Sequence, residues 1–313
     1  LGQRLIAIVV EGHRSRVYLN PEKHCENELK KQLLPICESK SFQDSLPNQE
    51  CRGTFASNAQ GRRYGFKTFK DYFTSRQLLS LTTFSDLVLE ARYKAISDAR
   101  NNGWHDDGIG LVDGGAGATA YGDAVAVYLS MAFDKGVDYW SSICSWHAGR
   151  DTIRNTFSRQ AIPMIWDYAE CNPFSSSAGS WLGSIEWTSR AIETTGWYNL
   201  GFVCQNDILS GTPIRDAIFS FDPPYFDNIE YADLSDFFYV WLRRINKNLF
   251  PNIFSTLLVP KTQELVASSA RHGGKKEAEK FFLQGMTRAL GNIHDAACEN
   301  LPLTIYYAFK QSK

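Results

Sequence analysis

Four adjacent residues, Asp222, Pro223, Pro224 and Tyr225, combine a carboxylate, two rigid residues and an aromatic ring. They follow the apolar segment 216–221, whose β-favouring content predicts a short buried strand. A proline cannot donate to a sheet ladder or continue a helix, so we expect the strand to stop here. The turn would then present Asp222 and Tyr225 at the carboxyl edge of a sheet, where ligands bind in open α/β folds. The alternative is a proline-capped strand end with a packed tyrosine.

This tetrapeptide resembles the catalytic motif of amino-group DNA methyltransferases, which transfer methyl from S-adenosylmethionine to adenine N6 or cytosine N4. The resemblance implies that the Asp222 carboxylate and the Pro223 carbonyl accept the two hydrogens of the exocyclic amine. The nitrogen lone pair, otherwise delocalised into the ring, would then point at the methyl group. Tyr225 would stack on a base swung out of the duplex, and the prolines would fix this geometry before the substrate arrives.

Longer stretches extend the resemblance over most of the chain, from about residue 5 to the end. Segments 73–88, 155–175, 222–244 and 301–312 are similar, in the same order, to large bacterial adenine-specific DNA methylases. Those proteins carry a zinc ribbon and an N-terminal domain of unknown function. Such long segments are far more specific than a tetrapeptide.

Three further residues are site candidates by position. Asp207 matches the acidic position that lies near the cofactor adenine, with a solvated turn aspartate as the alternative. Asn228 and Tyr231 follow the catalytic motif closely and could line the base pocket. Their alternative roles are capping and packing at the entry of a helix.

The resemblance implies an adenine-N6 DNA methyltransferase with S-adenosylmethionine as cofactor and DNA as partner. Subunits of a restriction-modification or phage-defence system are further candidate partners. Methylation of RNA or of cytosine N4 remains open, because aspartate before Pro-Pro favours adenine only weakly. An alternative from another class is a non-catalytic nucleic-acid-binding or assembly module.

Two features of the family have no clear counterpart. The family's Phe-x-Gly-x-Gly cofactor segment lies upstream of the matched region, and only the glycine-rich segment 113–122 imitates it. That segment is either a cofactor loop or a plain connector. The zinc ribbon is also missing, so we expect an internal or C-terminal portion of a larger methylase.

Bulk properties set limits on the class of protein. Hydrophobic residues make up 43% of the 313 residues and aromatic ones 13%, which indicates a globular chain. The formal charge of −1 excludes a strongly basic DNA-coating protein, but not an enzyme with local basic patches. Seven dispersed cysteines without a C-x-x-C pair predict reduced thiols in a cytoplasm and no metal site. No apolar run of about 18 residues predicts a membrane span.

Strands that alternate with helices predict an α/β fold: a doubly wound, mainly parallel sheet of the S-adenosylmethionine-dependent methyltransferase type, with a helical and loop-rich insertion. The predicted strands are 4–10, 201–207, 216–221 and 301–311, and the predicted helices are 74–102, 123–140, 232–245 and 276–296. Gly103 should stop the first of these helices. Residues 150–190 should form ordered loops packed by aromatics. We expect a lead-in over 1–82, the insertion over 83–200, and a methyltransferase core portion over 201–313.

Overall fold

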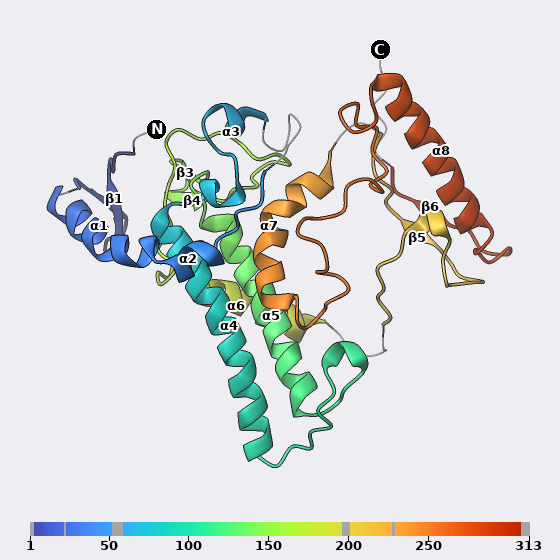
Figure 1. The fold of residues 1–313 in the computed structure, drawn as a ribbon, viewed down its shortest axis with the longest axis horizontal. Coiled ribbons are helices and arrows are strands. Elements are labelled where there is room, and N and C mark those ends of the chain that lie inside the picture. Colours follow the sequence, from blue (N-terminus) through green and yellow to red (C-terminus); the bar gives the residue numbers. More distant parts are fainter. Residues whose placement is uncertain (1–2, 22, 52–58, 196–200, 227–228, 308–313) are drawn as a thin grey trace. The chain divides into compact units, whose positions relative to one another are not determined.

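The computed structural model describes residues 3–21, 23–51, 59–195, 201–226 and 229–307 (Figure 1). The chain divides into two compact units. The first contains Leu1–Gly196 and Asp236–Leu258, and the second contains Trp197–Ser235 and Val259–Lys313. One division falls within helix α7 (Tyr231–Asn246).

The first unit is mainly helical, with two small antiparallel hairpins, β1–β2 and β3–β4. Its elements are β1 (Ile8–Glu11), β2 (Arg16–Leu19), α1 (Lys23–Glu38), α2 (Lys40–Ser45), α3 (Ala59–Arg63), η1 (Phe69–Tyr72), α4 (Ser75–Asn101), η2 (Leu111–Asp113), α5 (Ala118–Tyr139), β3 (Ser145–His147), β4 (Thr152–Arg154), α6 (Trp181–Thr194) and the part of α7 from Asp236.

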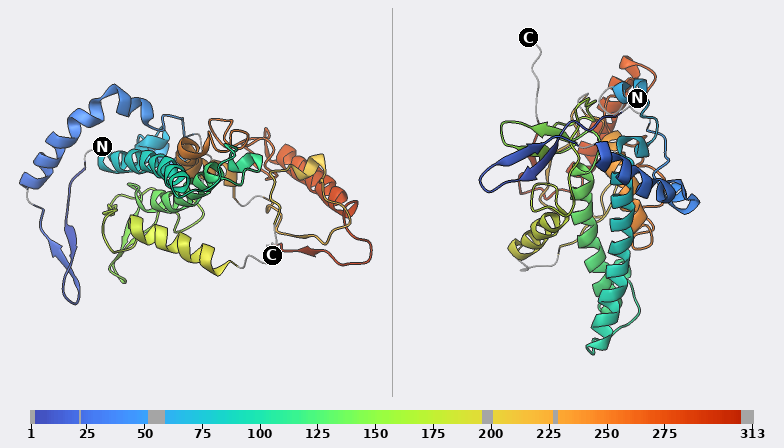
Figure 2. Two further views of the ribbon diagram at one scale, coloured as in Figure 1. Left: turned by 90° about the horizontal axis from the view of Figure 1, so that it is seen from below. Right: turned by 90° about the vertical axis from the view of Figure 1, so that its left-hand side faces the viewer.

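Helices α4 and α5 lie side by side (Figures 1 and 2). A capping box starts α4: the Thr74 hydroxyl accepts from the Gln77 amide at 3.3 Å, and the Gln77 side chain accepts from the Thr74 amide at 2.8 Å. Gly103, with φ of +82°, follows the end of α4. Both predicted helices and the glycine stop are confirmed, although α5 begins five residues before the predicted residue 123.

An aromatic core joins segments of the first unit that are far apart in sequence. Phe237 on α7 is fully buried, and its ring lies 6.0 Å from Tyr72, 5.4 Å from Phe73 and 5.4 Å from Phe157. Trp241, one turn later, packs edge-on against Phe73 at 5.5 Å. Burying such rings contributes the largest apolar area per residue, so this contact region dominates the stability of the unit.

The second unit is built round one parallel strand pair. Strand β5 (Ser220–Phe221) pairs with β6 (Thr304–Ile305), and a parallel bridge joins Ala217 to Ala297. Helix α8 (Lys275–His294) and the short helix η3 (Ile208–Ser210) complete the unit. The buried face of α8 consists of Ala278, Phe282, Ala289 and Ile293.

The fold is mixed helix and strand, as predicted at that level, but several elements differ from expectation. Residues 201–207 form no strand, because no described segment pairs with them, and Phe202 and Val203 are 80% and 94% exposed. The strands within 216–221 and 301–311 are only two residues long, and Ile305 is 45% exposed, so the predicted burial is wrong. Segment 150–190 contains β4 and most of α6, where loops were predicted.

The predicted domain boundaries differ from the division into compact units. Residue 82 lies inside α4, and segment 236–258 belongs to the first unit. Among the described residues, no helix is both long and apolar enough to cross a membrane.

Helix α5 buries an acidic side chain in the first unit. The Asp134 Oδ1 atom is buried and accepts no hydrogen bond from the described residues. Asp138, one turn later, accepts from the Asn155 side chain at 2.6 Å and from the Phe157 amide at 3.0 Å. Burial, together with the nearby Asp138, raises the pKa of Asp134 to about 7.

Asp134→Asn should therefore change how stability depends on pH. A raised folded-state pKa gives stability that is present below the ordinary value of 3.8 and lost as pH rises through about 7. We expect the variant to be about 1–3 kcal/mol more stable than wild type near pH 8, with the difference closing toward pH 4. Urea unfolding across that range measures it. The control Asp98→Asn, at an exposed carboxylate on α4, should leave the profile unchanged; a matching change there would refute the assignment to Asp134.

Candidate functional site

The β5–β6 ladder positions the Asp-Pro-Pro-Tyr turn in the second unit. The Thr304 amide donates to Phe219 O at 2.9 Å, and the Tyr306 amide donates to Phe221 O at 2.9 Å. The strand ends at Phe221, and Asp222 follows it directly. The predicted strand end and the placement of Asp222 just behind it are confirmed.

The turn presents its carboxylate to solvent and anchors its ring. Asp222 is exposed, and its carboxylate has no hydrogen-bond or ion-pair partner within the described part of the chain. Pro223, Pro224 and Tyr225 are half-buried. The Tyr225 ring packs edge-on against Tyr307, just beyond β6, with centroids 5.5 Å apart and an interplanar angle of 85°. The acceptor is therefore available to a ligand, while the turn that carries it is fixed.

Phe226 holds the far side of the turn. Its carbonyl accepts a hydrogen bond from the Ala267 amide at 2.7 Å. Its ring packs edge-on against Phe282 on the buried face of α8, at 5.2 Å and 87°. The turn is thus bound on both sides, by β6 and by α8 with the segment before it.

An ionic cluster lies next along the chain, at the start of α7. The Arg271 guanidinium lies 2.5 Å from Asp233 Oδ2 and 2.5 Å from Glu264 Oε2, with Glu230 Oε2 at 3.9 Å. The other Glu264 oxygen accepts from the Ala232 amide at 2.8 Å. Arg271 therefore ties the first turn of α7 to the segment that also holds Phe226 O.

Burial raises the pKa of Asp233, and the hydrogen bond from Arg271 opposes that rise. Only 6% of the Asp233 side chain and 14% of the Arg271 side chain are exposed. Arg271 opens the basic segment 271–276, and its charge is taken up by this buried cluster. Sequence spacing does not indicate this cluster, because Asp233 and Glu264 lie 38 and 7 residues from Arg271.

The other predicted site residues do not join the turn through any described contact. Asp207 caps η3: its side chain accepts from the Leu209 amide at 2.9 Å. Tyr231 is the first residue of α7 and is 45% exposed. Asn228 lies outside the described residues. Asp207 is thus an exposed capping residue, close to the solvated turn aspartate of its alternative interpretation.

The glycine-rich segment approaches its own backbone closely. A Cβ on Gly115 would lie 2.1 Å from Ile109 O, and one on Gly117 would lie 2.8 Å from the Asp106 Cα. The Asp106 carboxylate accepts from the Thr119 amide at 3.0 Å, and this bond lowers its pKa. The His105 carbonyl accepts from the Ala118 amide at 3.0 Å. The first amides of α5 are therefore engaged within the loop, as in a structural connector.

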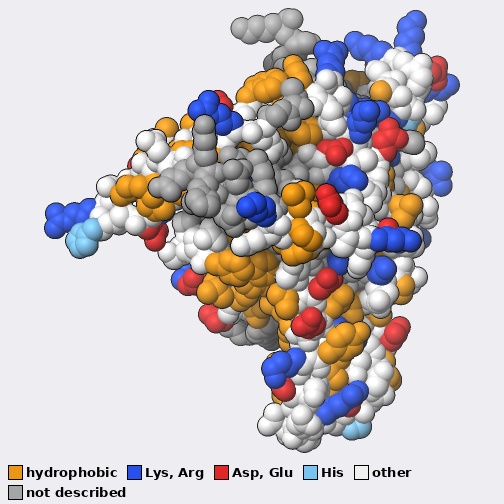
Figure 3. Space-filling view, turned by 60° about the vertical axis from the view of Figure 1, so that its left-hand side comes forward, with side chains coloured by type: hydrophobic (Ala, Val, Ile, Leu, Met, Phe, Trp, Pro, Cys, Tyr) orange, Lys and Arg blue, Asp and Glu red, His pale blue; other side chains and the backbone are white. Residues whose placement is uncertain are grey.

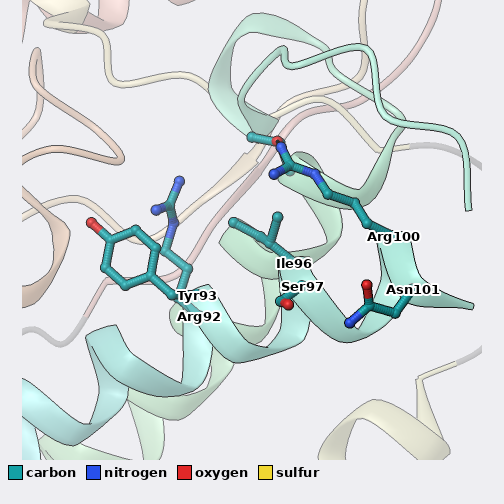
Figure 4. A pocket seen from close by; sticks show the side chains of 7 residues that line it. Arg92, Tyr93, Ile96, Ser97, Arg100 and Asn101 are labelled. Atoms are coloured by element: carbon teal, nitrogen blue, oxygen red, sulfur yellow. Dashed lines mark hydrogen bonds between the residues drawn. The ribbon is translucent and has the colours of Figure 1, made fainter.

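Two arginines of α4 also hold this connector. Arg92 Nε donates to Asp123 Oδ1 at 2.6 Å, and Arg100 Nε donates to Asp106 Oδ2 at 2.6 Å. Between them lies a shallow hollow of about 320 Å³, in which Arg92 and Tyr93 lie side by side (Figure 4). Both guanidinium groups are occupied in ion pairs, so the hollow serves the α4–α5 connection.

The six cysteines whose side chains the structure describes are free, and no group of three metal-ligating side chains occurs among the described residues. We compared the chain with known proteins, and no protein-family model, curated protein or solved structure matches it.

Arg271→Met should destabilise the second unit by about 3–5 kcal/mol, because one buried and two half-buried carboxylates lose their guanidinium partner. Hydrogen–deuterium exchange over α8 should rise accordingly. The matched control is Lys276→Met, which removes an exposed charge from the same segment and should leave exchange unchanged. Equal protection in both variants would show that the cluster does not stabilise this region.

Proposed function

We propose that this chain carries the base-binding part of an S-adenosylmethionine-dependent DNA adenine-N6 methyltransferase, with Asp222 as the catalytic residue. The observation that carries this proposal is the exposed Asp222 carboxylate, without a described partner, on a proline turn directly behind a parallel strand. The parallel β5–β6 pairing supports an α/β fold, of which the doubly wound sheet is one form, since all-parallel sheets occur almost only in α/β proteins.

The chemistry follows from what the turn offers. An exocyclic amino group is a poor nucleophile while its lone pair is delocalised into the base. Two acceptors, the Asp222 carboxylate and the Pro223 carbonyl, would bind its hydrogens and favour tetrahedral nitrogen. Tyr225, anchored by Tyr307, would stack on the extruded base. Asn228 and Tyr231 are further candidates for the base pocket.

The described residues do not fit the whole of S-adenosylmethionine. The close approach at Gly115 and Gly117 is to the loop's own backbone, and the first amides of α5 are already bonded. Asp207 keeps one carboxylate oxygen beyond its capping bond, enough for one contact near the cofactor adenine. We therefore derive no step through the cofactor from these residues.

The free thiols of the described cysteines suit the reducing cytoplasm, where we place this activity. DNA is the proposed partner, with subunits of a defence system as further candidates.

Asp222→Ala should lower transfer of labelled methyl to DNA by about 100-fold or more while leaving the free energy of unfolding unchanged.

The loss of methyl transfer should be mild in Tyr225→Phe and severe in Tyr225→Ala, because stacking is worth about 1–3 kcal/mol per base. Filter-bound radioactivity measures transfer, and circular dichroism checks the fold.

Near-normal transfer by Asp222→Ala would refute the assigned role. Equal losses from both Tyr225 variants would assign the function to its hydroxyl. A folded protein without any transfer, from the complete gene, would favour the non-catalytic nucleic-acid-binding module.

A further inference from the structure

Two β-hairpins of the first unit meet at their turns. The Tyr18 hydroxyl on β2 donates to Asp151 Oδ1 at 2.7 Å, and Trp146 Nε1 on β3 donates to the Tyr18 oxygen at 3.1 Å. The Tyr18 and Trp146 rings pack edge-on at 6.3 Å. Asp151 lies in the left-handed backbone region, with φ of 45°. Its carboxylate links the two hairpins through the hydrogen bond from Tyr18.

A hollow of about 460 Å³ lies between these turns. Its lining includes the guanidinium-bearing Arg16 and Arg150 and the hydroxyl-bearing Ser15 and Thr152. All four side chains carry hydrogen-bond donors, and the arginines come from different hairpins.

The acids at the hollow are already engaged. Glu11 pairs with Arg16 at 2.7 Å and accepts from Ser176 at 3.2 Å, while Asp151 accepts from Tyr18. Arg14 and Arg150 are exposed and form no ion pair with any described residue. With Arg16 they make three positive charges against the two carboxylates of Glu11 and Asp151, so this surface carries one positive charge in excess.

The excess extends over both hairpins. Segments 3–19 and 145–159 contain six arginines, no lysine and only two acids, a formal charge of +4 in a chain whose total is −1. Lys/Arg and His side chains cluster at the end of the projection formed by the β1–β2 hairpin, at the left of Figure 3. The arginines are Arg4, Arg14, Arg16, Arg150, Arg154 and Arg159.

This composition favours phosphate over carboxylate ligands. The arginine fork binds phosphate and carboxylate oxygens alike, so the preference comes from the hydroxyl groups of Ser15 and Thr152, which are common donors to a nucleic-acid backbone. Tyr18, 53% exposed beside the hollow, adds a ring for base or sugar contact. A phosphodiester backbone also repeats its charge, so it can use arginines on both hairpins at once.

We infer that the hollow between the two hairpin turns binds backbone phosphate of DNA, with Arg150 of its lining and Arg14 as the main contacts. Arg14 does not line the hollow but lies in the β1–β2 turn, next to the lining residue Ser15. This surface lies in the first unit and does not use the Asp222 turn. The choice of DNA as the ligand rests on the proposed function, but phosphate binding at this surface does not require methyl transfer.

The test is fluorescence anisotropy with a labelled DNA duplex of about 20 base pairs at several salt concentrations. Arg14→Gln/Arg150→Gln should weaken binding about tenfold and reduce the salt slope by about 2. The matched control is Lys94→Gln/Arg190→Gln, which removes two exposed positive charges from α4 and α6 and should bind within about twofold of wild type.

Equal weakening in the two double variants, or none in the first, would overturn the inference. So would competition by polyglutamate as strong as that by unlabelled duplex, or inorganic phosphate binding without duplex binding. The transfer assay on the wild-type protein separates the two proposals. Salt-dependent duplex binding that Arg14→Gln/Arg150→Gln weakens supports the hairpin site even if wild type transfers no methyl group and the proposed methyltransferase function fails.

Discussion

The missing amide hydrogens of Pro223 and Pro224 are the constraint on which the candidate site depends. They end the β5–β6 ladder at Phe221, so Asp222 emerges at the strand end without a sheet partner. The rest of the second unit fixes that turn. Tyr307 holds the Tyr225 ring, and α8 with the segment before it holds Phe226. An acceptor that is free while its backbone is fixed is what recognition of an amino group requires.

The first unit rests on a different principle. Its core is a set of interlocked aromatic rings on α7, η1 and the loop after β4, centred on Phe237. The hairpin turns and the α4–α5 connection lie outside this core and are held by polar interactions. In the connection, both arginines pair with an acid, Arg92 with Asp123 and Arg100 with Asp106. In the hairpin turns, Arg14 and Arg150 pair with no described acid, and they give that surface its distinct chemistry.

Sequence patterns predicted what local chemistry controls. The Gly103 stop and the strand end before Pro223 each depend on a few neighbouring residues. Patterns failed where the outcome depends on partners distant in sequence. Residues 201–207 have strand composition but pair with no described strand, and Arg271 finds its carboxylates 38 and 7 residues away. The glycines of 113–122 resemble a cofactor loop in sequence, but position 115 requires glycine because a Cβ there would lie 2.1 Å from Ile109 O.

The central claim is that Asp222 orients an adenine amino group for methylation. The most direct measurement is mass spectrometry of nucleosides from DNA of cells that lack other adenine methylation and express the complete gene. We predict N6-methyladenine with the wild-type sequence and none with Asp222→Ala, at equal levels of folded protein. N4-methylcytosine alone, or unmodified DNA in cells with abundant folded wild-type protein, would contradict the claim.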